Sequence, residues 1–373
     1  MAGTRYIDSV TDAEKLTQVT SIRAEVQRWA NDVLAHICGV TEWPFLWTTD
    51  WFQTVAPYET GTVAVTNAST TVTGTGTTFT AAMVGRKFRV ENQTGYYLIK
   101  AYVSATELTL EQAYTGDTDT EASYSVYKDE YLLRADVDSQ KQLKESENGI
   151  ALFSLSPFQF DNDIPIPSGE GVPHLSVYRG RAVKTYATGT VAMTSGTRII
   201  TGSSTLWTSV EGLTRGTKLK IGSLIFTINT VDSATQVTVY EVATATIAAG
   251  TSYTAILDNP VVQLHSIPDQ ILTIYYSFQR LPAVLSADND LPDLPYPMHP
   301  LISLGVLPNL WRHKGMMDRV EEAKGTFAAT LESWMVKYSQ PVTDRRILVE
   351  PFSIRRRTRE AGWPMGTGIP LYR

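Results

Sequence analysis

The chain has 373 residues, of which 43% are hydrophobic and 10% aromatic, so it is long enough for two or three domains with packed cores. Its formal net charge of -6 argues against a general nucleic-acid coat and against an anionic-membrane binder, because both need a net basic surface. The single cysteine, Cys38, excludes an intrachain disulfide and a cysteine-based zinc site, and it fits assembly in a reducing cytosol.

The first predicted element is an amphipathic helix over residues 12–38, followed by a passage rich in aromatic residues. Thr11 and Glu14 have the spacing of a capping box at the start of this helix, and Gly39 suits the left-handed position after its last turn. The aromatic passage, residues 43–52, predicts an anchor in a core or, as the less favoured alternative, a subunit contact. The apolar stripe of the helix consists of Leu16, Val19, Ile22, Val26, Trp29, Val33 and Ile37.

A β-rich passage then occurs twice. The first copy begins at Gly61 and the second at Gly189, 128 residues later, and Phe79 of the first copy matches Trp207 of the second. Threonines interleaved with valines favour pleated, half-buried strands. Two copies are too few for a solenoid or a propeller. Each copy is therefore predicted to be a small antiparallel sandwich or barrel of about six strands, inserted into a host fold.

The remaining elements belong to the host. Residues 174–179 and 271–278 have the pattern of strands, and a proline-rich link leads to a second helical region. Pro300 suits the first turn of the next helix, whereas Pro308 is expected to kink or break it. A last long helix is predicted for residues 317–338, with apolar residues along one face.

These elements predict an α+β protein: a helical-bundle host with a few strands, plus two small all-β sandwich or barrel insertions. The predicted division is residues 1–60 (first host part), 61–127 (module 1), 128–188 (second host part), 189–254 (module 2), 255–340 (third host part) and 341–373 (the C-terminal arm).

No residue pattern predicts an active site, a metal site or a cofactor site. A Cys38–His36 couple is not expected, because that spacing on a helix points the two side chains apart. Asp288, Asp290 and Asp293 have the chemistry to hold a hard cation, but the flanking prolines favour turn and cap roles. No apolar run is long enough to span a bilayer. The histidines, none of which has helical metal-motif spacing, are His36, His174, His265, His299 and His313.

The arm is the one strongly basic segment. One interpretation is a solvated tail. The other is a segment that orders on a partner, with arginines pairing acidic groups and apolar residues filling pockets. The predicted partner-binding residues are Arg345, Arg346, Phe352, Arg355, Arg356, Arg357, Arg359 and Trp363.

The host resembles the head-to-tail adaptor (connector) proteins of tailed bacteriophages, and the modules are similar to β modules found on phage virion proteins. The order of the host pieces carries the resemblance more than any one motif. These pieces are the N-terminal helix, W-P-F-L-W at 43–47, G-V-P-H-L-S-V-Y at 171–178, Ile274–Tyr276, Leu291-Pro292, Leu294-Pro295, the helix opened by His299 and Leu301, and the long helix ending near Tyr338.

The resemblance implies a structural virion protein, not an enzyme. It implies a ring, commonly of twelve copies, that binds the portal protein and carries tail or nozzle proteins. Genomic DNA passes through the ring without sequence-specific binding. Assembly in the bacterial cytoplasm and a final place in the virion neck follow, with no membrane partner. The arm is the expected portal-docking segment.

The competing interpretation is a peripheral virion adhesion or decoration protein whose modules bind a host surface. Exposed aromatic platforms on the modules would favour it. Phe79 and Trp207 occupy equivalent repeat positions, however, and are expected in the two module cores. An enzyme such as a wall hydrolase is disfavoured, because the sequence lacks a carboxylate or histidine constellation.

Overall fold

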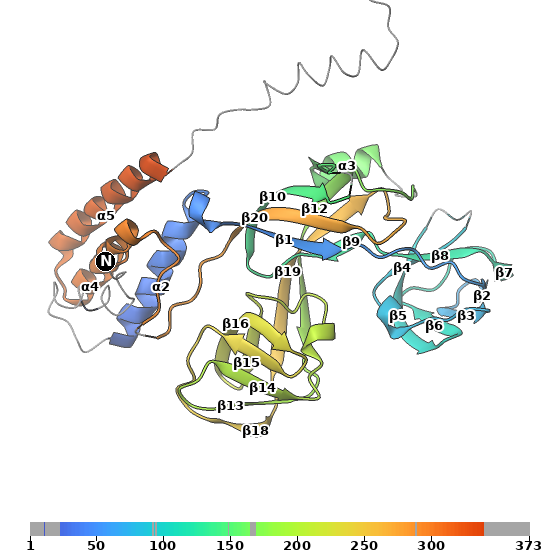
Figure 1. Ribbon diagram of the computed structural model, residues 1–373, viewed down its shortest axis with the longest axis horizontal. Helices are drawn as coiled ribbons and strands as arrows, with labels where there is room; N and C mark the ends of the chain where they lie inside the picture. The colour runs from blue at the N-terminus through green and yellow to red at the C-terminus, as the bar shows by residue number, and fades with distance from the viewer. Residues whose placement is uncertain are drawn as a thin grey trace, which may run out of the picture.

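The computed structural model describes Thr11 and residues 23–338, apart from residues 92, 94, 148, 165–168 and 288. Within this part of the chain most of the regular structure is β-strand in large antiparallel sheets, and three of the helices form one lobe. The predicted fold class, a helical-bundle host with a few strands and small β insertions, is therefore wrong. The middle of the host is itself β-structure (Figure 1).

The helical lobe lies at one end of the long axis (Figure 1). Helices α2 (Arg23–Gly39), α4 (Pro300–His313) and α5 (Met317–Tyr338) share one hydrophobic core with the turns η1 (Pro44–Leu46) and η4 (Tyr296–Met298). The side chain of Asn31 in α2 donates to the main-chain oxygen of Leu285, 254 residues later (2.9 Å). The lobe thus joins the first and third host parts.

The helix boundaries agree with the sequence in part. The start of α4 at Pro300 and the limits of α5 are those predicted. Pro308, however, lies buried inside α4 without ending it, because its packing in the lobe offsets the lost hydrogen bond. Gly39 is the last residue of α2 and does not take the left-handed conformation. Residues 12–22, with Glu14 of the predicted capping box, lie outside the described residues.

Two glycines in helices, one closely packed and one with open space around it, are expected to respond in opposite ways to substitution by alanine. A Cβ atom at Gly305 of α4 would lie 2.4 Å from Cγ1 of Val33 and 3.0 Å from Cε2 of Phe327, whereas one at Gly325 of α5 would meet nothing within 4 Å. We expect Gly305→Ala to lower the free energy of unfolding by about 1–3 kcal/mol through overpacking. Gly325→Ala should raise it by about 0.5–1 kcal/mol through helix propensity. Chemical denaturation measures both, and equal effects would contradict tight helix packing at Gly305.

The centre of the host is built from two sheets that share one core. One sheet has the order β1 (Trp47–Gln53), β20 (Thr273–Arg280), β10 (Val137–Glu145). The other contains β11 (Phe153–Leu155), β12 (Leu175–Tyr186), β19 (Thr254–His265) and β9 (Glu130–Leu132), and α3 (Pro157–Asp163) follows β11. Val262 and Leu264 of β19 and Ile274 and Phe278 of β20 lie together in this core.

The sequence under-predicted this β-structure for a physical reason. β19 is buried on both faces from Asn259 to Leu264, so the apolar–polar alternation of a half-buried strand is absent there. Its Pro260 also argues against a central strand. Pro260 is in register with Arg181 of β12, directly beside a β12 bulge at Arg179 and Gly180, where Gly180 has a φ of +90°.

Module 1 forms a seven-stranded antiparallel sheet in the order β7-β2-β3-β6-β5-β4-β8 around its own core. Its strands are β2 (Thr62–Val65), β3 (Thr71–Thr75), β4 (Lys87–Val90), β5 (Tyr97–Ser104), β6 (Glu107–Leu110), β7 (Asp119–Ala122) and β8 (Tyr124–Tyr127), with a turn η2 (Ala81–Met83). It lies at the end of the molecule opposite to the helices (Figure 1).

Module 2 repeats this strand pairing but ends differently. Its strands are β13 (Thr190–Met193), β14 (Ile199–Ser203), β15 (Lys218–Ile221), β16 (Leu224–Ser233), β17 (Gln236–Val239) and β18 (Ile247–Thr251), with a turn η3 (Trp207–Ser209). Its closing strand is the first part of β19, which continues into the central sheet. Module 2 is therefore joined to the host by the long β12–β19 ladder, whereas β8 of module 1 ends before the host sheet begins.

Candidate interaction surfaces

The residues predicted to bind a partner, Arg345 to Trp363 in the arm, all lie outside the described residues. The structure does fix the place from which the arm starts. Tyr338, the last residue of α5, packs edge-on against Phe45 of η1, with ring centroids 6.5 Å apart, and stacks on Trp334 at 5.7 Å. The last described residue before the arm therefore lies beside η1, directly before β1.

Two of the five histidines lie near each other. His174 and His265 have ring centroids 5.6 Å apart, because β12 and β19 pair Leu175 with His265. Burial and, second, the neighbouring His174 lower the pKa of His265. Sequence spacing gave no sign of this pair, since its members are far apart in the chain. Among the described residues no group of three or more histidines, cysteines or carboxylates has the geometry to hold a metal ion.

Asp290 and Asp293 have the predicted turn and cap roles. Asp290 accepts from the backbone N–H groups of Ser286 and Ala287 (2.8 Å each). Both oxygens of its carboxylate also accept hydrogen bonds from Arg198 of module 2, at 2.7 Å each. These bonds connect the proline-rich segment before α4 to that module. Asp293 accepts from Arg280 and from the backbone of the link. Asp288 lies outside the described residues.

Cys38 and His36 do not form a couple. The Cys38 side chain is 2% exposed, and burial, with Asp293 as the next cause, raises the pKa of its thiol to about 12. His36 is exposed and lies beside Phe327, with ring centroids 6.1 Å apart. The thiol is therefore buried and protonated at neutral pH, which makes it a poor nucleophile.

A chain of polar groups, exposed at Asp161 and buried at Asp129, crosses from α3 to module 1. Asp161 of α3 pairs with Arg179 (2.7 Å), whose Nε donates to Gln263 (2.7 Å). Gln263 donates to Asp129 (2.7 Å), and Lys87 of β4 lies 2.9 Å from the same carboxylate. Asp129 is 1% exposed and Lys87 6%, so this pair is fully removed from water and fixes module 1 against the host.

The lysine at the start of β4 has an equivalent in module 2 with a different environment. Burial alone would lower the pKa of Lys87, but Asp129 and Glu130 reverse this and raise it above the ordinary lysine value. Lys218 starts β15 and donates instead to Oγ1 of Thr227 (2.6 Å). Partial burial lowers the pKa of Lys218, and Glu241 only partly offsets that. The repeat thus keeps the lysine but pairs it with a buried carboxylate only in module 1.

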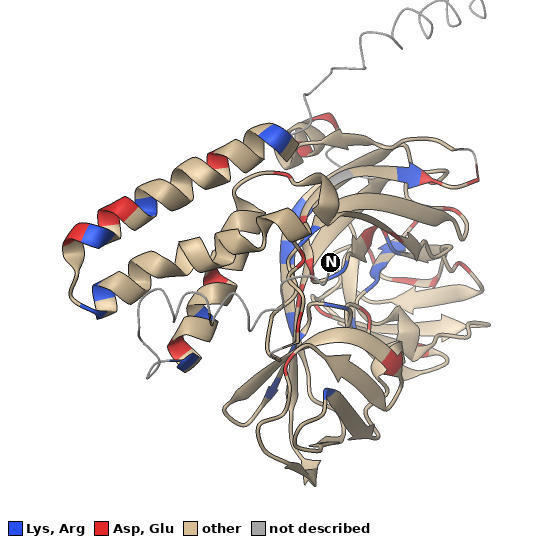
Figure 2. Cartoon of the chain, turned by 60° about the vertical axis from the view of Figure 1, so that its left-hand side comes forward, with Lys and Arg blue, Asp and Glu red and all other residues tan. Residues whose placement is uncertain are grey.

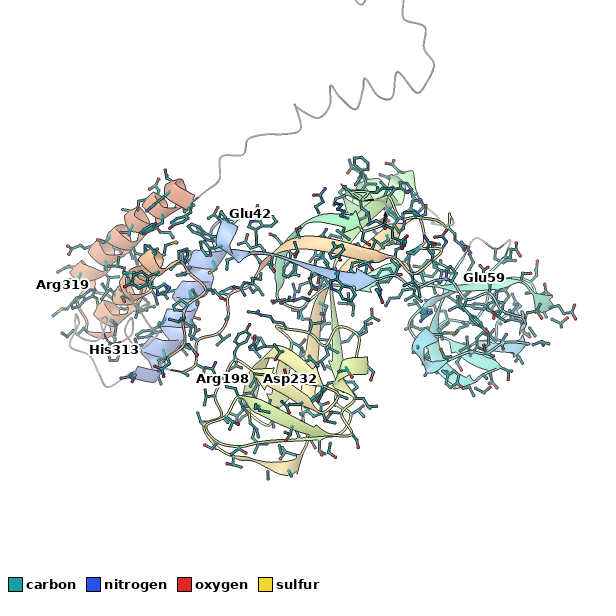
Figure 3. All side chains as sticks on the ribbon, in the orientation of Figure 1. Glu42, Glu59, Arg198, Asp232, His313 and Arg319 are labelled. Carbon is teal, nitrogen blue, oxygen red and sulfur yellow. The ribbon has the colours of Figure 1, made fainter. Side chains whose placement is uncertain are left out.

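A polar cleft of about 540 Å³ lies where module 1 meets the host. Glu59, labelled in Figure 3, and Glu91 line it together with Arg89 and Glu170. Arg89 lies 3.3 Å from Glu170. Burial, and next the charge of Glu59, raise the pKa of Glu170. Among the described residues that line it, the charged ones include three glutamates, more than Arg89 alone can pair, so the cleft offers acidic charge pairing.

The aromatic side chains that distinguish the two repeats are buried. Phe79 is 2% exposed and Trp207 1%, and each packs edge-on against the tyrosine of its own module, Tyr124 at 6.0 Å or Tyr253 at 5.9 Å. The expectation that both lie in module cores is confirmed. These positions therefore provide no surface platform for a glycan.

A comparison of the sequence with protein-family models gave no match, and a search among curated proteins gave none either. No helix among the described residues is both long enough and apolar enough to cross a bilayer.

Proposed function

We propose that this protein is a structural subunit of the ring that joins the portal to the tail in a tailed bacteriophage, surrounding the DNA channel. One observation carries the proposal. The pieces that resemble adaptor proteins, interrupted in sequence by two modules, fold into adjoining parts of one host: α2, η1, α4 and α5 share a core, and residues 171–178 and 274–276 enter the central sheets. The modules then become outgrowths of a ring subunit.

The distribution of charge supports this role. Residues 341–373 hold seven arginines and three carboxylates, a surplus of four positive charges, which leaves a net charge of -10 on the rest of the chain. In Figure 2 acidic and basic positions are interspersed over the helices and strands. An acidic body repels DNA phosphates and lets the genome slide past. A basic arm suits an acidic partner, which we assign to the portal.

The proposal is tested by removing the arm. Deletion of residues 341–373 should abolish binding to purified portal rings while leaving the host folded. A full-length variant with Arg355, Arg356, Arg357 and Arg359 replaced by glutamine should bind more weakly, and its remaining binding should depend less on salt. Portal binding by the deleted protein at wild-type affinity would contradict the role of the arm.

A further inference from the structure

The cleft where module 1 meets the host has a floor made by one face of a strand pair. β4 and β8 run antiparallel, with Arg89 directly opposite Ser125. The adjacent residues in the two strands, Phe88 and Val126, belong to the module core. Because successive side chains of a strand point to opposite faces, Arg89 and Ser125 point into the cleft, which both of them line. Glu91, two residues after Arg89, lies on the same face and also lines the cleft.

Ser125 provides a hydrogen-bonding group at this floor. The residue is 6% exposed, and its hydroxyl oxygen forms no hydrogen bond with any described residue. A buried hydroxyl without a partner costs about 1–3 kcal/mol, and such groups are uncommon in folded proteins. The hydroxyl of Ser125 is therefore placed to accept a hydrogen bond from an N–H group of a molecule bound in the cleft.

The walls of the cleft carry a surplus of negative charge. Arg89 lies 3.3 Å from Glu170, so these two charges balance each other. Glu59, labelled in Figure 3, and Glu91 are exposed, and neither forms an ion pair with a described residue. Two carboxylates in one cleft repel each other and attract cations. The raised pKa of Glu170, caused by burial and next by the charge of Glu59, agrees with this surplus.

The size and composition of the cleft indicate the kind of cation. Among the described residues no group of three or more histidines, cysteines or carboxylates has the geometry to hold a metal ion, which favours an organic cation. The volume of about 540 Å³ is far more than one ammonium group fills, and it lies in the range of small-molecule sites, roughly 300–1,000 Å³. The two carboxylates that Arg89 does not balance match a ligand with two positive charges.

We propose that this cleft binds a small organic cation of the polyamine class, with two ammonium groups on an aliphatic chain. Glu59 and Glu91 each pair with one ammonium group, and the hydroxyl of Ser125 accepts a hydrogen bond from one of them. The ligand thereby connects β4 and β8 of module 1 to the segment that joins β1 to the module. The inference goes beyond the proposed function and needs neither the ring nor the portal.

Isothermal titration calorimetry of the full-length protein with putrescine, a linear diamine, tests the site. We expect saturable binding of one molecule per chain. Butylamine has the same carbon chain but one ammonium group, and it should bind about tenfold more weakly. No saturable binding, or equal affinity for putrescine and for butylamine or magnesium at equal ionic strength, would overturn the proposal. Tighter binding of a dilysine peptide than of putrescine would overturn the free polyamine in favour of lysines from a partner protein.

Substitutions in the cleft give a second test. Glu59→Gln and Glu91→Gln should each weaken putrescine binding about threefold, and together about tenfold. Glu111→Gln is the matched control, because Glu111 is an exposed glutamate of module 1 that does not line the cleft. Ser125→Ala should weaken binding about threefold without lowering the melting temperature, since its hydroxyl has no partner to lose. Wild-type affinity in the double variant or in Ser125→Ala, or equal weakening by Glu111→Gln, would contradict the site.

Discussion

Lys87→Met is expected to lower the free energy of unfolding by about 3–5 kcal/mol, because removing one partner of a buried ion pair leaves the other charge uncompensated. Asp129 would keep only the hydrogen bond from Gln263 while remaining 1% exposed. Lys218→Met in module 2 is the matched control and should cost less than about 1 kcal/mol, since it loses a hydroxyl contact and the attraction of Glu241 but no direct ion pair. Urea denaturation of both variants measures the difference.

The pH dependence of this effect has a definite sign. The pKa of Lys87 is raised in the folded protein. The stabilisation of the folded state by Lys87 is therefore fully present below the ordinary lysine pKa, about 10.4, and is lost only as the pH rises through the folded-state pKa. The difference in the free energy of unfolding between the wild type and Lys87→Met should therefore be constant from about pH 6 to 9. Adding Asp129→Asn to Lys87→Met should recover part of the loss. A Lys87→Met cost equal to that of Lys218→Met would refute the buried pair.

Trp207→Ala is expected to cost about 3–5 kcal/mol by opening a cavity in the core of module 2. The indole is 1% exposed, and its N–H donates to the hydroxyl of Tyr253 at 2.9 Å. Because module 2 shares β19 with the central sheet, we expect the loss of stability to extend into the β12–β19 ladder. Chemical denaturation gives the magnitude, and hydrogen exchange shows which strands lose protection.

The repeat supplies the control for this substitution. Phe79 fills the equivalent position in module 1, so Trp207→Phe keeps an aromatic ring against Tyr253 and loses only volume and one hydrogen bond. Its cost should be about 1–2 kcal/mol. If Trp207→Ala and Trp207→Phe were equally mild, Trp207 would not be a central core residue.

The sequence correctly predicted those parts of the fold that are marked by patterns of residues close together in the chain. The limits of α5 and the start of α4 follow from apolar periodicity and from Pro300. The burial of Phe79 and Trp207 follows from their matched places in the repeat. The capping roles of Asp290 and Asp293 follow from the prolines around them.

The parts that the sequence did not predict depend on contacts between distant residues. β19 is buried on both faces, so its composition does not show the alternation of a strand, and the central sheets were underestimated as a result. The chain of polar groups through Asp129, Gln263 and Arg179 joins segments more than 80 residues apart. Neither spacing nor periodicity encodes such pairs, because the pairing of β19 with β12 on one side and with β9 on the other brings them together.

Electron microscopy of the purified protein with and without its portal tests the central claim most directly. The adaptor proposal predicts closed rings, with twelve copies as the expected number, seated on the portal with the modules projecting from the ring. It also predicts that the ring is lost from the portal when residues 341–373 are deleted. Monomers or trimers that ignore the portal and bind bacterial cells would contradict the adaptor role and support the adhesion alternative.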